Sequence, residues 1–344
     1  MKGKIKFAVV GCGHIGRRHA AMIRENEECE LVALCDVKPK EVLGIDEFPT
    51  PFFDNIETLL AQGPPADVVC ICTPNALHAA QSIKTLEHRR HVVVEKPMAL
   101  HKADCERIIF KALNVSRQVF CVMQNRYSPS AAWLKKIVEH GRLGKILMVQ
   151  VNCFWNRDDR YYFHDGQHHE WHGKRALDGG ILFTQFAHFI DLLYWIFGDI
   201  TNIRAQLANF LHGHSTDFED SGIAQFDFVN GGMGSLCFST AIWDKNFEST
   251  LSVVGTKGSV KLGGQYMNQL EYCHIEGLQP PTLPEAAPPN QYGPYQGSAA
   301  NHHFVIQNVV DVLKGRKEAT TNALEGMKVV EMIERIYDTV NSRP

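Results

Sequence analysis

The segment Gly11-Cys12-Gly13-His14-Ile15-Gly16 has a glycine spacing that can cradle the phosphates of a dinucleotide. It follows the apolar run Ile5–Val10 and opens a helical stretch. In that setting Gly11 permits a tight turn, Gly13 lets the backbone approach a pyrophosphate, and Gly16 lets the helix lie close to the strand. The helix N-terminus offers N–H groups and a partial positive charge to the phosphates. The segment predicts a dinucleotide site rather than a glycine turn without a ligand.

An acidic residue stands at the position where such a site contacts the ribose of the dinucleotide. Asp36 lies twenty residues after Gly16, at the end of the next apolar run. A carboxylate there accepts hydrogen bonds from ribose hydroxyls and repels a 2′-phosphate, so NAD is favoured over NADP. Lys38 is close enough in sequence to soften that preference.

A lysine follows a buried apolar run in Glu95-Lys96-Pro97. Ligands bind at the carboxyl ends of parallel strands, and Pro97 keeps Lys96 out of the helical region. Lys96 is therefore a candidate cation for a reacting group. A surface lysine paired with Glu95 is the alternative.

A second polar cluster lies in an otherwise apolar stretch, Leu182–Phe197, which reads as one helix. On such a helix Thr184, His188 and Asp191 share a face. A histidine in these surroundings needs a partner, so His188 is either a catalytic base or a satisfied core histidine.

These residues need a scaffold, and the first 120 residues supply one by alternating apolar runs with helical stretches. The expected strands are 5–10, 31–35, 68–72, 91–94 and 119–122, and the expected helices are 15–24, 56–61, 75–86 and 103–113. This alternation predicts a doubly wound parallel sheet, a Rossmann domain of the α/β class, over residues 1–124.

The pattern changes after that point. A helix from Ser128 to about Glu139 precedes strand-like runs at 146–156, 203–210, 222–228, 234–239, 250–254 and 258–262. Short glycine turns between the later runs indicate an antiparallel sheet. A proline- and glycine-rich loop at 277–297 and helices at 302–314 and 323–340 follow. We expect residues 125–344 to form an α+β domain with a largely antiparallel open sheet, which binds substrate and supports oligomerisation.

Composition excludes several classes of partner. The chain has 344 residues, a formal charge of −3 and no long basic block, which gives little support for nucleic-acid binding. Its first apolar run is too short for a signal core or a membrane span. Ten scattered cysteines without a Cys-x-x-Cys pair fit free thiols. We therefore expect a cytoplasmic protein that engages neither nucleic acid nor membrane.

Taken together, the motifs resemble the Gfo/Idh/MocA family of oxidoreductases. The resemblance rests on the glycine fingerprint, Cys72-Thr73-Pro74-Asn75 with His78, Glu95-Lys96-Pro97, Asn125-Arg126-Tyr127, and Gly179-Gly180 followed by His188 and Asp191. The family implies hydride exchange between nicotinamide and the hydroxyl carbon of a sugar or polyol. By resemblance His188 is the general base, Lys96 stabilises the developing alkoxide, and Asp191 orients the histidine or its helix.

The resemblance also implies the remaining contacts. Cofactor contacts are expected from Gly11, Gly13, His14, Ile15, Gly16, Asp36, Thr73, Asn75, His78, Glu95, Lys96 and Gln124. One position departs from the family: Thr184 stands where an acidic residue, or in some branches asparagine, precedes the histidine by four. We therefore expect a Lys96–His188 catalytic pair with Thr184 or Gln185 as a polar auxiliary, rather than a triad containing an aspartate.

Four segments in the middle of the chain carry a narrower resemblance: Asn125–Pro129, Phe154–Arg157, Tyr161-Tyr162 and Trp171–Gly173. They are similar to a branch of the family that contains UDP-N-acetylglucosaminuronate 3-dehydrogenases of surface-polysaccharide synthesis. Substrate contacts are expected from Lys96, Arg126, Tyr127, Arg157, Trp171, Gln185 and His188. Arg157, Arg160, Lys174 and Arg175 could meet a carboxylate or phosphates, or could be solvated surface charges.

The histidines at 164, 168, 169 and 172 form a dense group, and those at 164, 168 and 172 would share a face able to hold a metal if that segment were helical. Asp165-Gly166 argues for a loop there, so no metal is expected. The prediction is an NAD-dependent sugar dehydrogenase acting on a sugar or nucleotide sugar, assembled as a homodimer or homotetramer. A dehydrogenase of free sugar or polyol, another redox reaction such as imine reduction, and a catalytically silent NAD sensor remain as alternatives.

Overall fold

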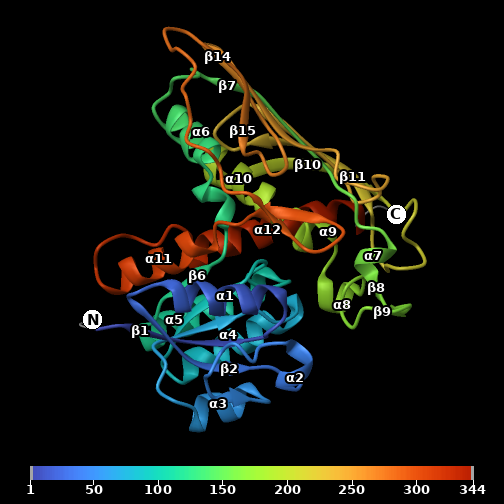
Figure 1. Ribbon diagram of the computed structural model, residues 1–344. Helices are drawn as coiled ribbons and strands as arrows, with labels where there is room; N and C mark the ends of the chain where they lie inside the picture. Colours follow the sequence, from blue (N-terminus) through green and yellow to red (C-terminus); the bar gives the residue numbers. More distant parts are fainter. Residues whose placement is uncertain (1–2, 342–344) are drawn as a thin grey trace. The chain divides into compact units, whose positions relative to one another are not determined.

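The computed structural model describes residues 3–341. Contacts divide the chain into two compact units (Figure 1). Within the described residues, unit 1 comprises 3–123 together with His302–Val330, and unit 2 comprises Gln124–Asn301 together with 331–341. The sequence-based division at residue 124 placed both closing helices in the second domain, whereas contacts group α11 (His302–Leu313) and the start of α12 (Ala323–Asn341) with unit 1.

Unit 1 is built on a parallel sheet of six strands. The strands are β1 (Ile5–Val10), β2 (Cys29–Cys35), β3 (Phe52–Phe53), β4 (Val68–Ile71), β5 (His91–Val94) and β6 (Val119–Cys121). The helices are α1 (His14–Glu25), α2 (Lys40–Leu43), α3 (Ile56–Gln62), α4 (His78–Glu87), α5 (Lys102–Val115), α11 (His302–Leu313) and the first part of α12 (Ala323–Asn341).

The strand order is β3-β2-β1-β4-β5-β6, and each neighbouring pair is parallel. Strands β1 to β3 are added toward one edge of the sheet and β4 to β6 toward the other. The order of the strands therefore reverses between β1 and β4, which is the switch point at which doubly wound sheets bind ligands. The central strands are apolar and buried, as expected for a sheet covered on both faces. The predicted doubly wound parallel sheet is confirmed.

Helix α11 joins unit 1 through an apolar face. Its buried residues include Val305, Ile306 and Val309, and it packs against α1. The side-chain amide of Asn26 donates to Gln307 at 2.9 Å. Burial of that face gives the physical reason why a helix so late in the chain returns to the first fold unit.

Unit 2 contains a seven-stranded sheet in the order β10-β11-β12-β7-β13-β14-β15. Its strands are β7 (Ile146–Phe154), β10 (Ile200–Ala208), β11 (Ser221–Phe228), β12 (Met233–Ser239), β13 (Glu248–Gly255), β14 (Gly258–Gly263) and β15 (Gln269–Ile275). Only the β12–β7 pair is parallel among these described strands, so the predicted largely antiparallel sheet is confirmed.

The helices of unit 2 include α6 (Pro129–Glu139), α7 (Asp159–Tyr162), α8 (Arg175–Asp178), α9 (Ile181–Thr184) and α10 (Ala187–Phe197). Two short hairpins, β8–β9 (Phe163–His164, Gln167–His168) and β16–β17 (Pro289–Gln291, Gln296–Ala299), complete it. The second hairpin occupies the end of the segment predicted as a loop.

One predicted helix is wrong. The stretch Leu182–Phe197 is two helices, α9 and α10, because Phe186 leaves helical geometry with φ −109° and ψ 1°. The segments Arg175–Thr184 and Ala187–Phe197 meet at a bend of 50°. Thr184 therefore lies on a different helix from His188 and Asp191, and the shared helical face expected from spacing is not present.

Within residues 3–341, no single helix combines the length and apolar character needed to cross a bilayer, and only that bent pair meets the criteria when taken together.

Candidate functional site

The glycine loop after β1 has the geometry that the fingerprint predicts. Gly11 adopts φ +86°, and a Cβ on it would lie 2.6 Å from the carbonyl carbon of Cys72. A Cβ on Gly16 would lie 1.7 Å from the Gly11 oxygen. Gly13, which precedes the first turn of α1, has nothing within 4 Å of a Cβ position. Gly11 and Gly16 therefore leave no room for a side chain, whereas the space at Gly13 is open and can admit a phosphate group.

Asp36 holds this loop from the end of β2. Its carboxylate accepts from the Cys12 amide at 2.6 Å and from the Lys38 amide at 2.9 Å. Each carboxylate oxygen has a second lone pair, so these bonds leave capacity for ribose hydroxyls. The geometry fits NAD at this loop.

The turn after β4 is tied to the turn after β5 by His78. This histidine is 1% exposed, and its Nδ1 and Nε2 lie 2.6 Å from the Pro97 oxygen and 2.8 Å from the Thr73 oxygen. Burial lowers the pKa of His78, and the two carbonyl contacts oppose that effect. Both ring nitrogens are committed to backbone, so His78 supports the two turns instead of offering a ring nitrogen to a cofactor.

Lys96 follows a buried carboxylate. Glu95 Oε1 lies 2.9 Å from His19 Nε2 and 3.5 Å from His302 Nε2, and its Oε2 accepts from the Lys96 amide at 3.2 Å. Glu95 is thus occupied by two histidines and a backbone amide, while the side chain of Lys96 is half-buried. Nothing in the sequence pattern pointed to His19 or His302, because they come from α1 and α11, far from Glu95 along the chain.

His19, Glu95 and His302 are also the one group in the described residues whose ligand atoms lie within 4.8 Å of one another. Metal-bound histidines normally donate their second ring nitrogen to an acceptor. Here Nδ1 of both histidines is buried without a hydrogen-bond partner among the described residues. The donor set fits a hydrogen-bonded cluster around Glu95 better than a metal centre.

In unit 2, the catalytic candidate His188 and the residue expected to orient it, Asp191, are both buried on α10, at 3% and 0% exposure. Arg126 donates to Asp191 from Nε at 2.9 Å and from the terminal nitrogen Nη2 at 2.6 Å. Sequence reasoning placed Arg126 against substrate. The structure instead gives it a structural role, because its guanidinium is completely buried in a two-point ion pair.

Thr184 has a carboxylate partner that spacing did not reveal. Its hydroxyl donates to the side chain of Asp178, the last residue of α8, and lies 3.1 Å from the Asp178 carbonyl oxygen. Asp178 is 1% exposed and also accepts from the Gly173 amide at 2.9 Å.

The four basic residues considered for substrate binding separate clearly. Arg160 pairs with Asp158 at 2.6 Å, Arg175 pairs with Glu219 at 3.0 Å, and Lys174 donates to the Glu170 carbonyl. All three are exposed at the surface. Arg157 differs, because it is 2% exposed and no carboxylate pairs with it among residues 3–341.

Arg157 sits instead among neutral groups. It donates to the side-chain oxygens of Gln185 and Asn246 and to the carbonyl oxygens of Asn156 and Gln296, at 2.5 to 3.3 Å. Its guanidinium carbon lies 4.8, 5.6 and 4.9 Å from the ring centres of Trp155, Tyr161 and Tyr295.

Burial lowers the pKa of Arg157. A buried cation whose charge is not balanced is costly, and such a group suits an anionic ligand.

Three more of the predicted residues are Gln124, Tyr127 and Trp171. Gln124 is 3% exposed with Oε1 lacking a partner in the described chain, Tyr127 is half-buried, and Trp171 stacks on His172 with ring centres 3.9 Å apart. The histidine-rich segment forms the β8–β9 hairpin, where Asp165 and Gly166 adopt positive φ, so the helical arrangement needed for a histidine metal site is absent there.

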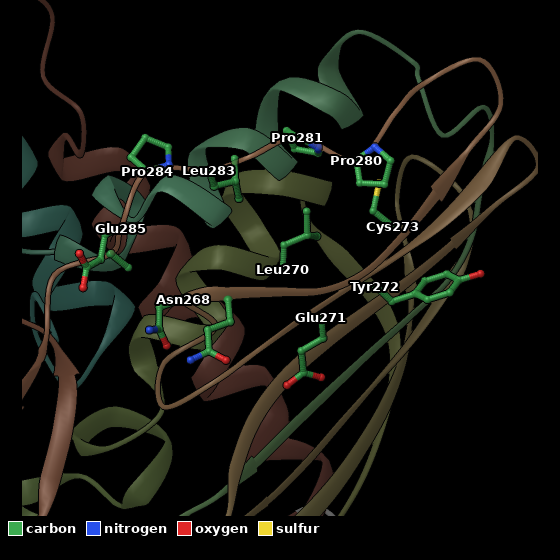
Figure 2. A pocket seen from close by; sticks show the side chains of 12 residues that line it. Asn268, Leu270, Glu271, Tyr272, Cys273, Pro280, Pro281, Leu283, Pro284 and Glu285 are labelled. Carbon is green, nitrogen blue, oxygen red and sulfur yellow. The ribbon is translucent and has the colours of Figure 1, made fainter.

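A recess of about 670 Å³ lies beside the edge strand β15 and the proline-rich segment after it. Figure 2 shows the side chains that line it. Its lining includes Leu270, Tyr272, Pro280 and Leu283. None of the residues predicted to do chemistry lines it, so we assign it no catalytic role.

Comparison with known proteins agrees with this geometry. Residues 5–122 match the model described as oxidoreductase family, NAD-binding Rossmann fold, and residues 132–261 match the GFO/IDH/MocA C-terminal domain. The WlbA dehydrogenase of Bordetella pertussis, solved with NADH and UDP-GlcNAcA, is 31% identical with a TM-score of 0.88 over 98% of this chain and 97% of that one.

Two further relatives extend the comparison. The WlbA dehydrogenase of Chromobacterium violaceum, also solved with NADH and UDP-GlcNAcA, is 28% identical with a TM-score of 0.87 over 99% of this chain and 95% of that one. The myo-inositol 2-dehydrogenase of Thermotoga maritima is 25% identical over 74% of this chain and 74% of its own length.

The fold, the loop geometry and the matching family model define an NAD-dependent oxidoreductase. The chain belongs to the Gfo/Idh/MocA family.

Proposed function

We propose that the chain oxidises a hydroxyl carbon of an anionic nucleotide sugar, namely C3 of a UDP-linked N-acetylaminosugar uronate, within surface-polysaccharide synthesis. The observation that carries the proposal is Arg157, a buried guanidinium balanced by no carboxylate in the described chain. A uronate carboxylate would balance this charge and can accept a charge-assisted hydrogen bond from the fifth guanidinium N–H, which the four contacts to protein oxygens do not use. The similarity to WlbA structures that hold UDP-GlcNAcA supports the same class of substrate.

The catalytic roles follow from chemistry and family resemblance. NAD, when bound, supplies the hydride acceptor. Lys96 donates a hydrogen bond to the reacting oxygen and stabilises negative charge on it as the C–H bond breaks. His188 takes the hydroxyl proton. The cluster around Glu95 fixes the backbone on which Lys96 stands.

The test is NADH formation with three substrates: UDP-GlcNAcA, the uncharged UDP-GlcNAc, and myo-inositol. The proposal expects turnover with the first and a loss of about a hundredfold or more in kcat/KM with the second. Turnover with myo-inositol alone would favour the free-polyol alternative, which the Thermotoga relative supports. An absence of turnover despite NADH binding would favour the silent sensor.

Variants connect that activity to the site. Lys96→Ala and His188→Ala are each expected to lower kcat by about a hundredfold or more. Arg157→Lys keeps the positive charge but loses the planar set of guanidinium N–H donors. This variant should therefore raise KM for UDP-GlcNAcA more than it lowers kcat. The exposed residues Lys136 and His88 provide matched controls, and their alanine variants should keep wild-type kinetics. Full turnover in the first two variants refutes the mechanism.

We further propose that a second copy of the chain covers the outer face of the unit 2 sheet, giving the homodimer or homotetramer. Met148 is paired in register with Met233 on one side and Val254 on the other, and the three side chains are 48%, 54% and 41% exposed. Exposed apolar side chains on adjacent strands favour association. Light scattering should show an oligomer that Met148→Glu with Met233→Glu converts to monomer; a wild-type monomer would reject this interface.

A further inference from the structure

The position four residues before His188 lacks the carboxylate or amide that the family resemblance leads one to expect, because Thr184 stands there. The structure supplies a carboxylate to that position from another helix. Asp178 is the last residue of α8, and the hydroxyl of Thr184, at the end of α9, donates to its side chain. We propose that Asp178 and Thr184 act as one unit that replaces the missing side chain, with Asp178 a positioning residue that works through Thr184. This inference rests on the proposed dehydrogenase function.

The backbone between the two helices is shaped for this contact. Gly179 and Gly180 adopt φ +91° and +117°, conformations that other residues rarely take. A Cβ on Gly180 would lie 2.3 Å from the hydroxyl of Tyr337. The two glycines therefore reverse the chain tightly enough to bring α9 back against the end of α8.

Asp178 is fixed on its other side as well. Its second carboxylate oxygen accepts from the Gly173 amide at 2.9 Å, and the side chain is 1% exposed. Thr184 is 9% exposed. A hydrogen bond to a buried carboxylate is stronger than one between neutral groups, so the hydroxyl is held in one orientation.

This orientation sets the chemistry of Thr184. A threonine hydroxyl has a single proton, and here that proton is given to Asp178. Towards any other group, the Thr184 oxygen can then act only as an acceptor. A carboxylate at position 184 would also be an acceptor. The pair therefore reproduces the hydrogen-bonding character of such a carboxylate, with the negative charge on Asp178 instead of on residue 184.

The decisive experiment moves the carboxylate. Thr184→Asp places a second acid beside Asp178, and two buried carboxylates repel each other, so this variant should be less active and less stable than wild type. Asp178→Asn alone removes the charge and should lower kcat/KM by about tenfold or more. Combining the two changes leaves one carboxylate, at the family position, and should recover activity to within about tenfold of wild type.

Conservative variants provide the controls. Thr184→Ser keeps the hydroxyl and should retain activity, whereas Thr184→Val removes it and should match Asp178→Asn. Combining Thr184→Val with Asp178→Asn should cost little more than either change alone, because both remove one interaction. NADH affinity should stay at the wild-type value in all of these proteins.

The outcomes separate the possibilities. If Asp178 had a purely structural role, the losses of activity in Thr184→Val and Asp178→Asn would add, and combining Thr184→Asp with Asp178→Asn would recover no activity. That result would overturn the proposal. If the wild-type chain oxidises no sugar, thermal unfolding still tests the pair, since the double variant should unfold at a higher temperature than Thr184→Asp alone. Failure of the proposed function and failure of the pair are therefore distinguishable.

Discussion

Arg126 and Asp191 form a two-point ion pair in which both side chains have no exposed surface. The pair links the turn at Gln124–Tyr127 to α10, the helix that carries His188. The guanidinium also lies 5.3 Å from the ring centre of Trp195. A residue expected to meet substrate is thus part of the support beneath the proposed base.

Breaking that pair on one side should be costly. Asp191→Ala leaves a buried arginine without its partner and should reduce the free energy of unfolding by about 3–5 kcal/mol. Chemical denaturation measures this. Asp104→Ala, which breaks the exposed pair with Arg107, is the control and should cost less than about 1 kcal/mol. Equal losses in the two variants would contradict the assigned role.

Gly13 and Gly16 should respond differently to alanine. Gly16→Ala places a methyl group 1.7 Å from a backbone oxygen and should destabilise unit 1 by about 1–3 kcal/mol or prevent its folding. Gly13→Ala meets no protein atom, so thermal unfolding without cofactor should match wild type while NADH affinity falls by about tenfold or more. Unchanged NADH affinity in Gly13→Ala would place the pyrophosphate elsewhere.

The charge of Asp36 should set cofactor choice. Asp36→Asn keeps an oxygen that can accept from the Cys12 amide but removes the negative charge, so NADPH binding should improve relative to NADH. Asp36→Ala also loses the loop contact and should weaken both cofactors. Fluorescence titration with NADH and NADPH measures the two affinities, and an unchanged ratio in both variants would show that Asp36 does not read the ribose.

Glu95 should make the stability of unit 1 sensitive to acid. Burial opposes ionisation, but hydrogen bonds from His19 and His302 outweigh it and hold the pKa of Glu95 well below its ordinary value of 4.5. A carboxyl with a depressed pKa contributes stability above its unfolded-state pKa and loses it as pH falls through the folded-state value. The unfolding temperature should therefore fall steeply below about pH 4.5.

Glu95→Gln removes that titration and should flatten the acid limb. The exposed Glu87→Gln variant is the control and should keep the wild-type slope. Parallel slopes for wild type and Glu95→Gln would show that another group governs the acid response.

Local pattern was enough for the cofactor half of this protein. Strand Ile5–Val10, the three glycines and Asp36 lie within one continuous stretch, and each has a task set by backbone sterics or a single charge. The strand at His91–Val94 placed Lys96 at the carboxyl end of a parallel strand in the same way. The alternation of apolar and polar residues also indicated the antiparallel sheet, because successive side chains of a strand point to opposite faces of the sheet.

Spacing failed where contacts cross between elements. The helix break at Phe186 removed the face that Thr184 and His188 were expected to share. The sequence does not distinguish the environments of Arg126 and Arg157. In the structure Arg126 is neutralised by Asp191, whereas Arg157 is enclosed by neutral oxygens and aromatic rings.

By itself, then, the sequence determined the family and the NAD loop and predicted which side chains react, since these depend on residue type and short-range geometry. Only the tertiary structure decided which charges are balanced, that His19 and His302 surround Glu95, and that Asp178 reaches Thr184. Those relationships join residues on different elements, and a buried charge or hydroxyl acquires its chemical role only from the partners that the fold brings within hydrogen-bonding distance.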